Sequence, residues 1–247
     1  MELKAEDKIL GVIPARYESQ RLPGKVLREI AGKPMIQLVY EAASRSLLLH
    51  EVLVATDSSM VEEACRSRQI PVMLTGQHPS GSDRLFEVMQ RTDATIYVNI
   101  QGDEPMVRPE HIDLLVAPFE KPEIEVSTLK VAISPETAQN PNVVKVVTDT
   151  SGRALYFSRC PIPYHREPDE ERQYFKHLGL YAFRRQALER FHSLPQSSLE
   201  VRERLEQLRF LENGIAIQVA ETAFDTVGVD TEEDLLRVEA ILRVERT

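Results

Sequence analysis

Short apolar runs alternate with amphipathic segments through the first half of the chain. The runs at residues 9–13, 52–55 and 95–100 are mostly apolar and rich in β-branched residues, which predicts strands buried on both faces. Between them, apolar residues recur at helical spacing and predict helices over 35–49 and 60–68. This succession of strands and helices is typical of a parallel sheet with helices on its faces.

The second half has a different pattern. Strand-like runs at 126–133, 143–147 and 154–157 are separated by turn residues, which predicts an antiparallel or mixed sheet. Another apolar run at 177–183 precedes two predicted helices. The most polar segment, residues 166–173, has a proline as its only apolar residue, and we expect it to be a mobile loop.

Apolar stripes mark two helices near the end of the chain. In the helix predicted over 198–212 the stripe consists of Val201, Leu205, Leu208 and Leu211. In the final helix, which opens at Asp230, it consists of Leu235, Val238 and Leu242. Thr231 and Asp234 have the spacing of a capping box, which predicts the start of this final helix. Between the two helices, Asn213 and Gly214 predict a turn into a strand-like run at 215–219.

Composition excludes several classes of protein. At 247 residues the chain fits a single α/β domain, which we predict over residues 1–247. Its 42% hydrophobic and 28% charged residues exclude a disordered or collagen-like chain. A net charge of −9, from 30 Lys and Arg against 39 Asp and Glu, has the wrong sign for a general binder of nucleic acids or anionic membranes. No apolar run approaches the roughly 20 residues that cross a bilayer.

The cysteines and the first residues suggest a compartment. Cys65 and Cys160 have no spacing typical of a disulfide framework or a zinc site, and we expect each to be a buried apolar side chain. The first residues mix both charges and lack the basic-then-apolar order of a secretory signal. Both observations predict a protein of the reducing cytoplasm.

A basic loop follows the first predicted strand. Residues 14–25, PARYESQRLPGK, contain Arg16, Arg21 and Lys25 together with a glycine. Ligands bind at the carboxyl ends of strands in open parallel sheets, and cations with backbone N–H groups suit a polyphosphate. We therefore predict that this loop binds a nucleoside triphosphate, although a solvated surface loop is the alternative. It is not a P-loop, because Val26 stands where that motif has Ser or Thr.

Acidic residues follow two other apolar runs. Asp103 lies in the turn that ends the strand at 95–100, and Asp230 ends a short run before the final helix. Carboxylates can hold a hard divalent cation, which phosphate chemistry needs in order to offset the charge of the substrate. A plain turn at Asp103 and a helix cap at Asp230 are the alternatives. The two carboxylates would form a cation site if the fold brought them together.

The segment HPSGSDRL combines polar donors with an apolar anchor. Ser80, Gly81 and Arg84 could read a base edge and a ribose, whereas Ser82 followed by Asp83 could instead cap a helix.

Arg159, His177 and Tyr181 could bind an acidic sugar, because a guanidinium pairs with a carboxylate in a bidentate fork. A structural histidine within a strand is the alternative for His177.

Nine segments, taken in order, resemble the CMP-Kdo synthetase family, the 3-deoxy-manno-octulosonate (Kdo) cytidylyltransferases. They are PARYESQRLPGK, ATDSS, HPSGSDRL, VNIQGDEP, NPNVVKVV, YFSRCPIPY, KHLGLYAFR, LEQLR and GVDTEEDL. The resemblance covers nearly the whole chain. It implies an α/β, Rossmann-like three-layer nucleotidyltransferase fold, with a mostly parallel central sheet and a smaller mixed-sheet region for sugar binding and dimerisation. It also implies a homodimer that converts CTP and Kdo to CMP-Kdo and pyrophosphate with Mg²⁺, for lipopolysaccharide synthesis.

The resemblance implies roles for single residues. The residues that match the CTP site are Pro14, Ala15, Arg16, Lys25, Ser80, Gly81, Arg84 and Gln101. Those that match the sugar site are Gln101, Arg159, His177, Tyr181, Glu206 and Gln207. Asp103 and Asp230 match the magnesium ligands, and together with Arg16 and Lys25, which face the phosphates, they form the catalytic set. Residues 201–204, VRER, are more polar than the resemblance leads us to expect.

Two alternatives remain open at this point. One is a cytidylyltransferase for a related acidic sugar, such as an amino-substituted octulosonate or a sialic-acid-like sugar. The other is a protein that binds CTP without turnover, against which the joint presence of Lys25, Asp103 and Asp230 argues. CTP and Kdo are the expected partners, and we expect neither nucleic-acid binding nor membrane insertion.

Overall fold

The computed structural model describes residues 7–19, 21–167 and 172–244. By their contacts these residues divide into two compact units. We call residues 7–113 with 226–244 the N-terminal unit and residues 114–225 the central unit, and the single domain expected over residues 1–247 stays a prediction. Part of the expected mobile loop, residues 168–171, lies outside the described residues. No helix of the described chain is long and apolar enough to cross a membrane.

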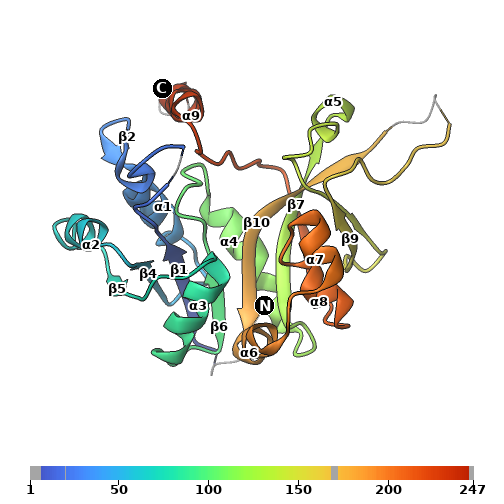
Figure 1. The fold of residues 1–247 in the computed structure, drawn as a ribbon, viewed down its shortest axis with the longest axis horizontal. Coiled ribbons are helices and arrows are strands. Elements are labelled where there is room, and N and C mark those ends of the chain that lie inside the picture. Colours follow the sequence, from blue (N-terminus) through green and yellow to red (C-terminus); the bar gives the residue numbers. More distant parts are fainter. Residues whose placement is uncertain (1–6, 20, 168–171, 245–247) are drawn as a thin grey trace. The chain divides into compact units, whose positions relative to one another are not determined.

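The N-terminal unit is built on parallel strands in the order β6-β1-β4-β5. Their bounds are Ile9–Pro14 for β1, Glu51–Thr56 for β4, Val72–Leu74 for β5 and Ile96–Asn99 for β6. The helices are α1 (Met35–Ala43), α2 (Ser59–Arg66) and α3 (Gly81–Gln90), and α4 (Pro109–Val116) crosses the point where the two units divide. α3 packs against β6 and β1 and lies in front of β6 in Figure 1. The strands predicted at 9–13, 52–55 and 95–100 are confirmed as β1, β4 and β6, and their apolar side chains are buried apart from the half-buried Leu53.

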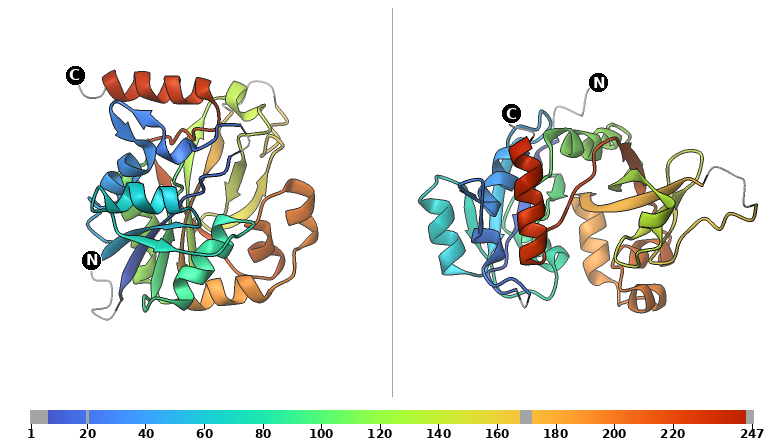
Figure 2. Two further views of the ribbon diagram at one scale, coloured as in Figure 1. Left: turned by 60° about the vertical axis from the view of Figure 1, so that its left-hand side comes forward. Right: turned by 90° about the horizontal axis from the view of Figure 1, so that it is seen from above.

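A small hairpin and the final helix complete this unit. β2 (Glu29–Ile30) pairs with β3 (Lys33–Pro34), and the 3-10 helix η1 (Lys25–Leu27) precedes them. α9 (Glu232–Val244) lies beside the hairpin in both views of Figure 2. The expected stripe of α9 is confirmed: Leu235 and Val238 are buried in one cluster, with Leu242 packed against it.

The central unit contains a mixed sheet, as the pattern of its runs predicts. β7 (Val126–Ile133) is antiparallel to β10 (Tyr174–Arg184) and parallel to β11 (Gln218–Thr222). β8 (Lys145–Thr148) pairs with β10 and with β9 (Ala154–Ser158). The remaining elements are α5 (Pro135–Ala138), α6 (Arg185–Ser193), α7 (Ser198–Glu203), α8 (Leu208–Glu212) and the 3-10 helix η2 (Ala117–Glu120). Helices α6, α7 and α8 gather on one side of β7 and β10 (Figure 1).

The helix predicted over 35–49 is shorter than expected. It ends at Ala43, and Leu47 is 88% exposed. Beyond the end of α1, the Ser46 hydroxyl donates to Asp113 at 2.6 Å and accepts from the Leu48 N–H at 3.2 Å. Such side-chain bonds to nearby groups compete with helix formation.

The helix predicted over 198–212 is two helices, because Arg204 has the left-handed φ of 53°. The continuous apolar stripe is therefore wrong at Val201, which is 58% exposed, whereas Leu205 and Leu208 are buried. The strand expected at 215–219 begins three residues later, as β11. Cys65 is buried as expected, but Cys160 is exposed.

Candidate active site

The ammonium group of Lys25 joins two carboxylates that are far apart in the sequence. Its Nζ lies 2.5 Å from Oδ2 of Asp103 and 2.9 Å from Oδ1 of Asp230. Arg21 donates to the other oxygen of Asp230 at 2.8 Å. All four residues belong to the N-terminal unit. The fold therefore brings the two carboxylates together, which is the condition for the cation site that the sequence suggests.

Two glycines place these side chains. Gly24 has a φ of +65° and packs under the ring of Tyr17, so it turns the chain directly before Lys25. Gly102 lies against the end of β1, where an added Cβ would be only 2.7 Å from the backbone oxygen of Pro14. A glycine at residue 102 thus lets the turn that carries Asp103 approach the carboxyl end of β1.

Asp230 does not cap the final helix. The Thr231 hydroxyl accepts from the Asp234 N–H at 3.2 Å, and the Asp234 carboxylate accepts from the Thr231 N–H at 3.0 Å. This reciprocal pair is the predicted capping box. The Val229 N–H donates to the Asp103 backbone oxygen at 2.8 Å, which ties the segment before α9 to the turn after β6. Because the cap is supplied by Thr231 and Asp234, the Asp230 carboxylate is directed to Arg21 and Lys25 instead.

The charge of Lys25 is stabilised by its surroundings. Burial by itself would lower the pKa of Lys25, but the charges of Asp103 and Asp230 and their hydrogen bonds outweigh burial and raise it. Lys25 therefore remains a cation at neutral pH. Its side chain is 14% exposed, whereas those of Asp103 and Asp230 are 32% and 48% exposed.

The donor set fits Mg²⁺. Within the described residues, no three His, Cys, Asp or Glu side chains gather as a metal site. Mg²⁺ rarely uses an all-protein cage; it usually binds one or two carboxylates together with waters and substrate phosphates. Asp103 and Asp230 match that requirement, because both carboxylates already approach one positive group.

The residues expected to bind the base lie at the start of α3. Ser80 caps this helix by accepting from the Asp83 N–H at 3.1 Å, so the cap is Ser80 rather than Ser82. An added Cβ at Gly81 would lie 3.7 Å from Pro14 and 3.9 Å from Asn99, which places the first turn of α3 beside the ends of β1 and β6.

Arg84 is fully buried and engaged inside the unit. Its guanidinium lies 3.2 Å from the Asp57 carboxylate and also donates to the Thr75 hydroxyl and the Gly76 carbonyl. These contacts support the loops around the start of α3. A direct contact between Arg84 and a base stays a prediction.

The other expected CTP residues lie at the same edge of the sheet. Ala15 is buried, and its N–H donates to the Ala55 carbonyl at 2.9 Å. Gln101 lies two residues after the end of β6. Arg16 is half-buried, and no acidic side chain in the described part of the chain pairs with it. The positive charge of Arg16 therefore remains available for an anionic ligand.

Gln101 belongs to the N-terminal unit, whereas the other expected sugar residues lie in the central unit. Two of them adjoin each other on β10. The rings of His177 and Tyr181 are 5.4 Å apart. The register of β10 against β7 shifts between Leu178 and Tyr181, and the Thr128 hydroxyl of β7 occupies this irregularity. It lies 3.0 Å from His177 Nε2 and donates to the Leu178 carbonyl at 3.1 Å.

Burial keeps both of these side chains neutral. It lowers the pKa of His177 to about 3, with the charge of Lys176 adding to the effect. It raises the pKa of Tyr181 well above its ordinary value, and the nearby negative charge of Glu206 acts in the same direction. At neutral pH His177 and Tyr181 are therefore both uncharged polar groups.

Arg159 and the residues after α7 are joined by direct hydrogen bonds. Arg159 Nε donates to the Glu203 carbonyl at 2.7 Å, and Nη2 donates to the Arg204 carbonyl at 3.4 Å. The turn that begins at Arg204 leads to Glu206 and Gln207, of which Gln207 is 8% exposed. The structure thus connects Arg159 to the segment that carries two further expected sugar residues, Glu206 and Gln207.

Comparisons with known proteins agree with one another along the chain. A family model described as cytidylyltransferase matches residues 10–219. The chain is 58% identical to the 3-deoxy-manno-octulosonate cytidylyltransferase of Acidobacterium capsulatum over 235 residues, 95% of this chain and 96% of that protein. It is 54% identical to the Koribacter versatilis protein of the same name, over 96% of this chain and 90% of that protein. This chain belongs to the 3-deoxy-manno-octulosonate cytidylyltransferase family.

A solved structure extends the likeness to the fold of this family. CMP:2-keto-3-deoxy-manno-octonic acid synthetase complexed with CTP is 48% identical, with a TM-score of 0.93. The match covers 97% of this chain and all of that one. The predicted fold class, a nucleotidyltransferase with a mostly parallel central sheet, is confirmed.

The sequence did not reveal three residues whose hydrogen bonds support expected sugar residues or their surroundings. Thr128 gave no signal, because a threonine is ordinary in a strand. Glu203 lies off the apolar stripe predicted for residues 198–212, and its carboxylate accepts from the Ser158 hydroxyl and the Arg159 N–H. Lys145 lies within a strand-like run yet is fully buried, and its ammonium group donates to three backbone carbonyls.

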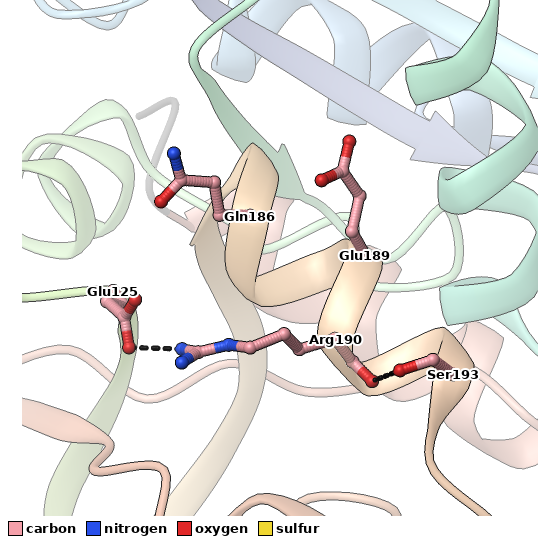
Figure 3. A pocket seen from close by; sticks show the side chains of 5 residues that line it. All are labelled: Glu125, Gln186, Glu189, Arg190 and Ser193. Carbon is pink, nitrogen blue, oxygen red and sulfur yellow. Dashed lines mark hydrogen bonds and ion pairs between the residues drawn. The ribbon is translucent and has the colours of Figure 1, made fainter.

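A surface pocket of the central unit is separate from these residues. It is lined by Glu125, Gln186, Glu189, Arg190 and Ser193, from α6 and the residue before β7 (Figure 3). Arg190 pairs with Glu125, and the Ser193 hydroxyl donates to the Arg190 carbonyl at 2.7 Å. None of the lining residues belongs to the expected cytidylyltransferase site.

Proposed function

We propose that this chain transfers the cytidylyl group of CTP to Kdo and releases pyrophosphate. The observation that carries the proposal is the meeting of Lys25, Asp103 and Asp230 at the carboxyl ends of β1 and β6. Membership of the family supports the same reaction. The anomeric hydroxyl of Kdo attacks the α-phosphorus of CTP, and the bond from that phosphorus to the bridging oxygen of pyrophosphate breaks.

The residues of this chain contribute positioning and charge. Phosphoryl transfer needs little covalent help from a protein, because most of the catalysis comes from orientation and from offsetting charge. Lys25 and Arg16 supply positive charge for the phosphate oxygens. The backbone around Pro14, Ala15 and Gly81 borders the proposed place of the nucleoside, and Gln101, two residues after the end of β6, adjoins it.

Mg²⁺ is the proposed cofactor, held by Asp103 and Asp230. When bound, it offsets the charge of the phosphates and lowers the pKa of a hydroxyl that it contacts. Arg159, His177, Tyr181, Glu206 and Gln207 are the proposed sugar ligands, with Arg159 as the partner of the Kdo carboxylate. We further propose that the chain works as a homodimer in the cytoplasm, in the synthesis of lipopolysaccharide.

The decisive experiment measures pyrophosphate release by the purified protein from CTP and Mg²⁺, with and without Kdo. Release that depends on Kdo is the expected result. Absence of Kdo-dependent release would overturn the proposal. An amino-substituted octulosonate and a sialic acid are tested as competing acceptors in the same assay, and a preference for either over Kdo would contradict the proposed substrate.

A further inference from the structure

A reciprocal contact joins the end of β9 to the end of α7 in the central unit. The Glu203 carboxylate accepts from the Arg159 backbone N–H at 2.9 Å, while the Arg159 side chain donates from Nε to the Glu203 backbone oxygen at 2.7 Å. Each residue thus binds the backbone of the other with its side chain. The second carboxylate oxygen of Glu203 accepts from the Ser158 hydroxyl at 2.7 Å. Both oxygens of Glu203 are therefore used.

The same contact restrains the guanidinium of Arg159. Besides the Nε bond, Nη1 donates to the Pro141 carbonyl at 3.0 Å and Nη2 to the Arg204 carbonyl at 3.4 Å. A guanidinium has five N–H groups. One N–H on each terminal nitrogen therefore remains after these bonds, and N–H groups of this kind can donate to a carboxylate.

Hydrogen bonds also hold the end of β9, next to Arg159. Ser158 is 2% exposed, and its hydroxyl accepts from the Cys160 N–H at 3.0 Å. The buried ammonium of Lys145 donates to the Arg159 carbonyl at 2.6 Å. On the other side, Arg204 takes its left-handed φ of 53° directly after Glu203. Glu203 therefore lies where the fixed end of β9 meets the turn toward Glu206.

We propose that Glu203 is a positioning residue of the sugar site, which orients the Arg159 guanidinium and the turn from Arg204 to Gln207. This role rests on the proposed function, because it matters only if Arg159 and Gln207 hold the acceptor sugar. Glu203 itself does not contact the substrate. The Glu203 carboxylate has a geometric role. It fixes the direction of the Arg159 N–H groups that donate to the carboxylate of the sugar.

A matched control exists in the same pair of helices. Glu212 of α8 accepts from the Ser198 hydroxyl at 3.1 Å and from the Leu199 N–H at 2.9 Å. It therefore has the same kinds of partner as Glu203, one serine hydroxyl and one backbone N–H. None of its partners is an expected sugar residue.

The experiment compares Glu203→Gln with Glu212→Gln in the pyrophosphate assay, with Kdo and CTP varied separately. A glutamine has one acceptor oxygen where the carboxylate has two. We expect the KM for Kdo to rise about tenfold or more in Glu203→Gln, as for loss of one hydrogen bond to a charged group. The KM for CTP should stay within about twofold. Glu212→Gln should leave both KM values within about twofold.

A purely structural role would lower Tm and the fraction of active protein without changing the KM for Kdo. An unchanged KM for Kdo in folded Glu203→Gln, or an equal rise in Glu212→Gln, would overturn the positioning role. If Glu203→Gln does not fold, Ser158→Ala removes one of the two bonds to the carboxylate, and an unchanged KM for Kdo there has the same meaning. A wild-type chain without Kdo-dependent release would instead overturn the proposed function, and the positioning role with it.

Discussion

Lys25 lies 2.5 Å from Asp103 although 78 positions separate them in the sequence. The same ammonium group is 2.9 Å from Asp230, so one lysine offsets part of the repulsion between two carboxylates. A lysine in this position has two consequences. It stabilises the carboxylate pair before substrates bind, and it adds a positive charge for the phosphates.

Replacing Lys25 with methionine should make the carboxylate pair more dependent on a metal. We expect Mg²⁺ to raise the Tm of Lys25→Met more than that of the wild type, because a cation then relieves a repulsion that Lys25 no longer offsets. Pyrophosphate release should fall by about 100-fold or more. Thermal unfolding with and without Mg²⁺ tests this, with Lys33→Met as control because Lys33 pairs with Glu41 instead. An equal response to Mg²⁺ in Lys25→Met and wild type would contradict the role of Lys25.

Asp103→Asn should separate activity from stability. Lys25 keeps its contact with Asp230 in this variant, so the Tm should stay within a few degrees of the wild type. Mg²⁺-dependent release of pyrophosphate should fall by about 100-fold or more, because one of the two proposed metal ligands has lost its charge. Asp93→Asn, an exposed change before β6, serves as the control. Full activity in Asp103→Asn would refute the assignment of Asp103.

Gly102→Ala should disturb the site through the backbone. The new Cβ would lie 2.7 Å from the Pro14 oxygen, and a backbone atom of a buried strand end cannot move away easily. We expect a loss of about 1–3 kcal/mol in the free energy of unfolding, typical of overpacking. Gly76→Ala is the control, because its Cβ would meet only side-chain atoms, of Glu87 at 3.5 Å and of His78 at 3.9 Å. Chemical denaturation of both variants measures the difference, and equal stability would count against this packing.

His177 should make stability depend on pH. Burial lowers its pKa to about 3 in the folded chain, whereas an unfolded histidine titrates near its ordinary value of 6.5. Between these values the unfolded chain binds the extra proton, so stability falls as the pH falls below about 6.5. The difference in unfolding free energy between wild type and His177→Gln should shrink by on the order of 1 kcal/mol per pH unit from pH 6 to 5. It should be constant from pH 7 to 8, and a difference independent of pH throughout would contradict the buried neutral state.

Local patterns predicted elements well where hydrophobic burial decides the conformation. The strands at the start of the chain and the stripe of α9 are examples, because their periodicity directly reflects which face is buried. Prediction was wrong where a side chain competes with the backbone or where one residue adopts an unusual dihedral angle. Ser46 forms side-chain bonds beyond the early end of α1, and Arg204 interrupts the helix expected through residue 212.

The residues of the candidate site also fall into those that the sequence revealed and those that it did not. The candidate residues were recognisable because glycines, acids and cations follow apolar strands in the sequence, and because nine segments match a family in order. Thr128 and Glu203 were not recognisable, since their roles depend on partners 49 and 44 positions away.

The sequence by itself determined which segments are buried, the parallel and mixed parts of the sheet, and the family, because all three depend on residue type and order along the chain. The tertiary structure alone decided that Lys25 meets Asp103 and Asp230 and that Glu203 binds Arg159. The physical reason is that hydrogen bonds and ion pairs act over a few ångströms in space. Which groups come within that distance depends on how the strands and turns pack. For groups far apart in the sequence, the residues next to each group do not reveal this packing.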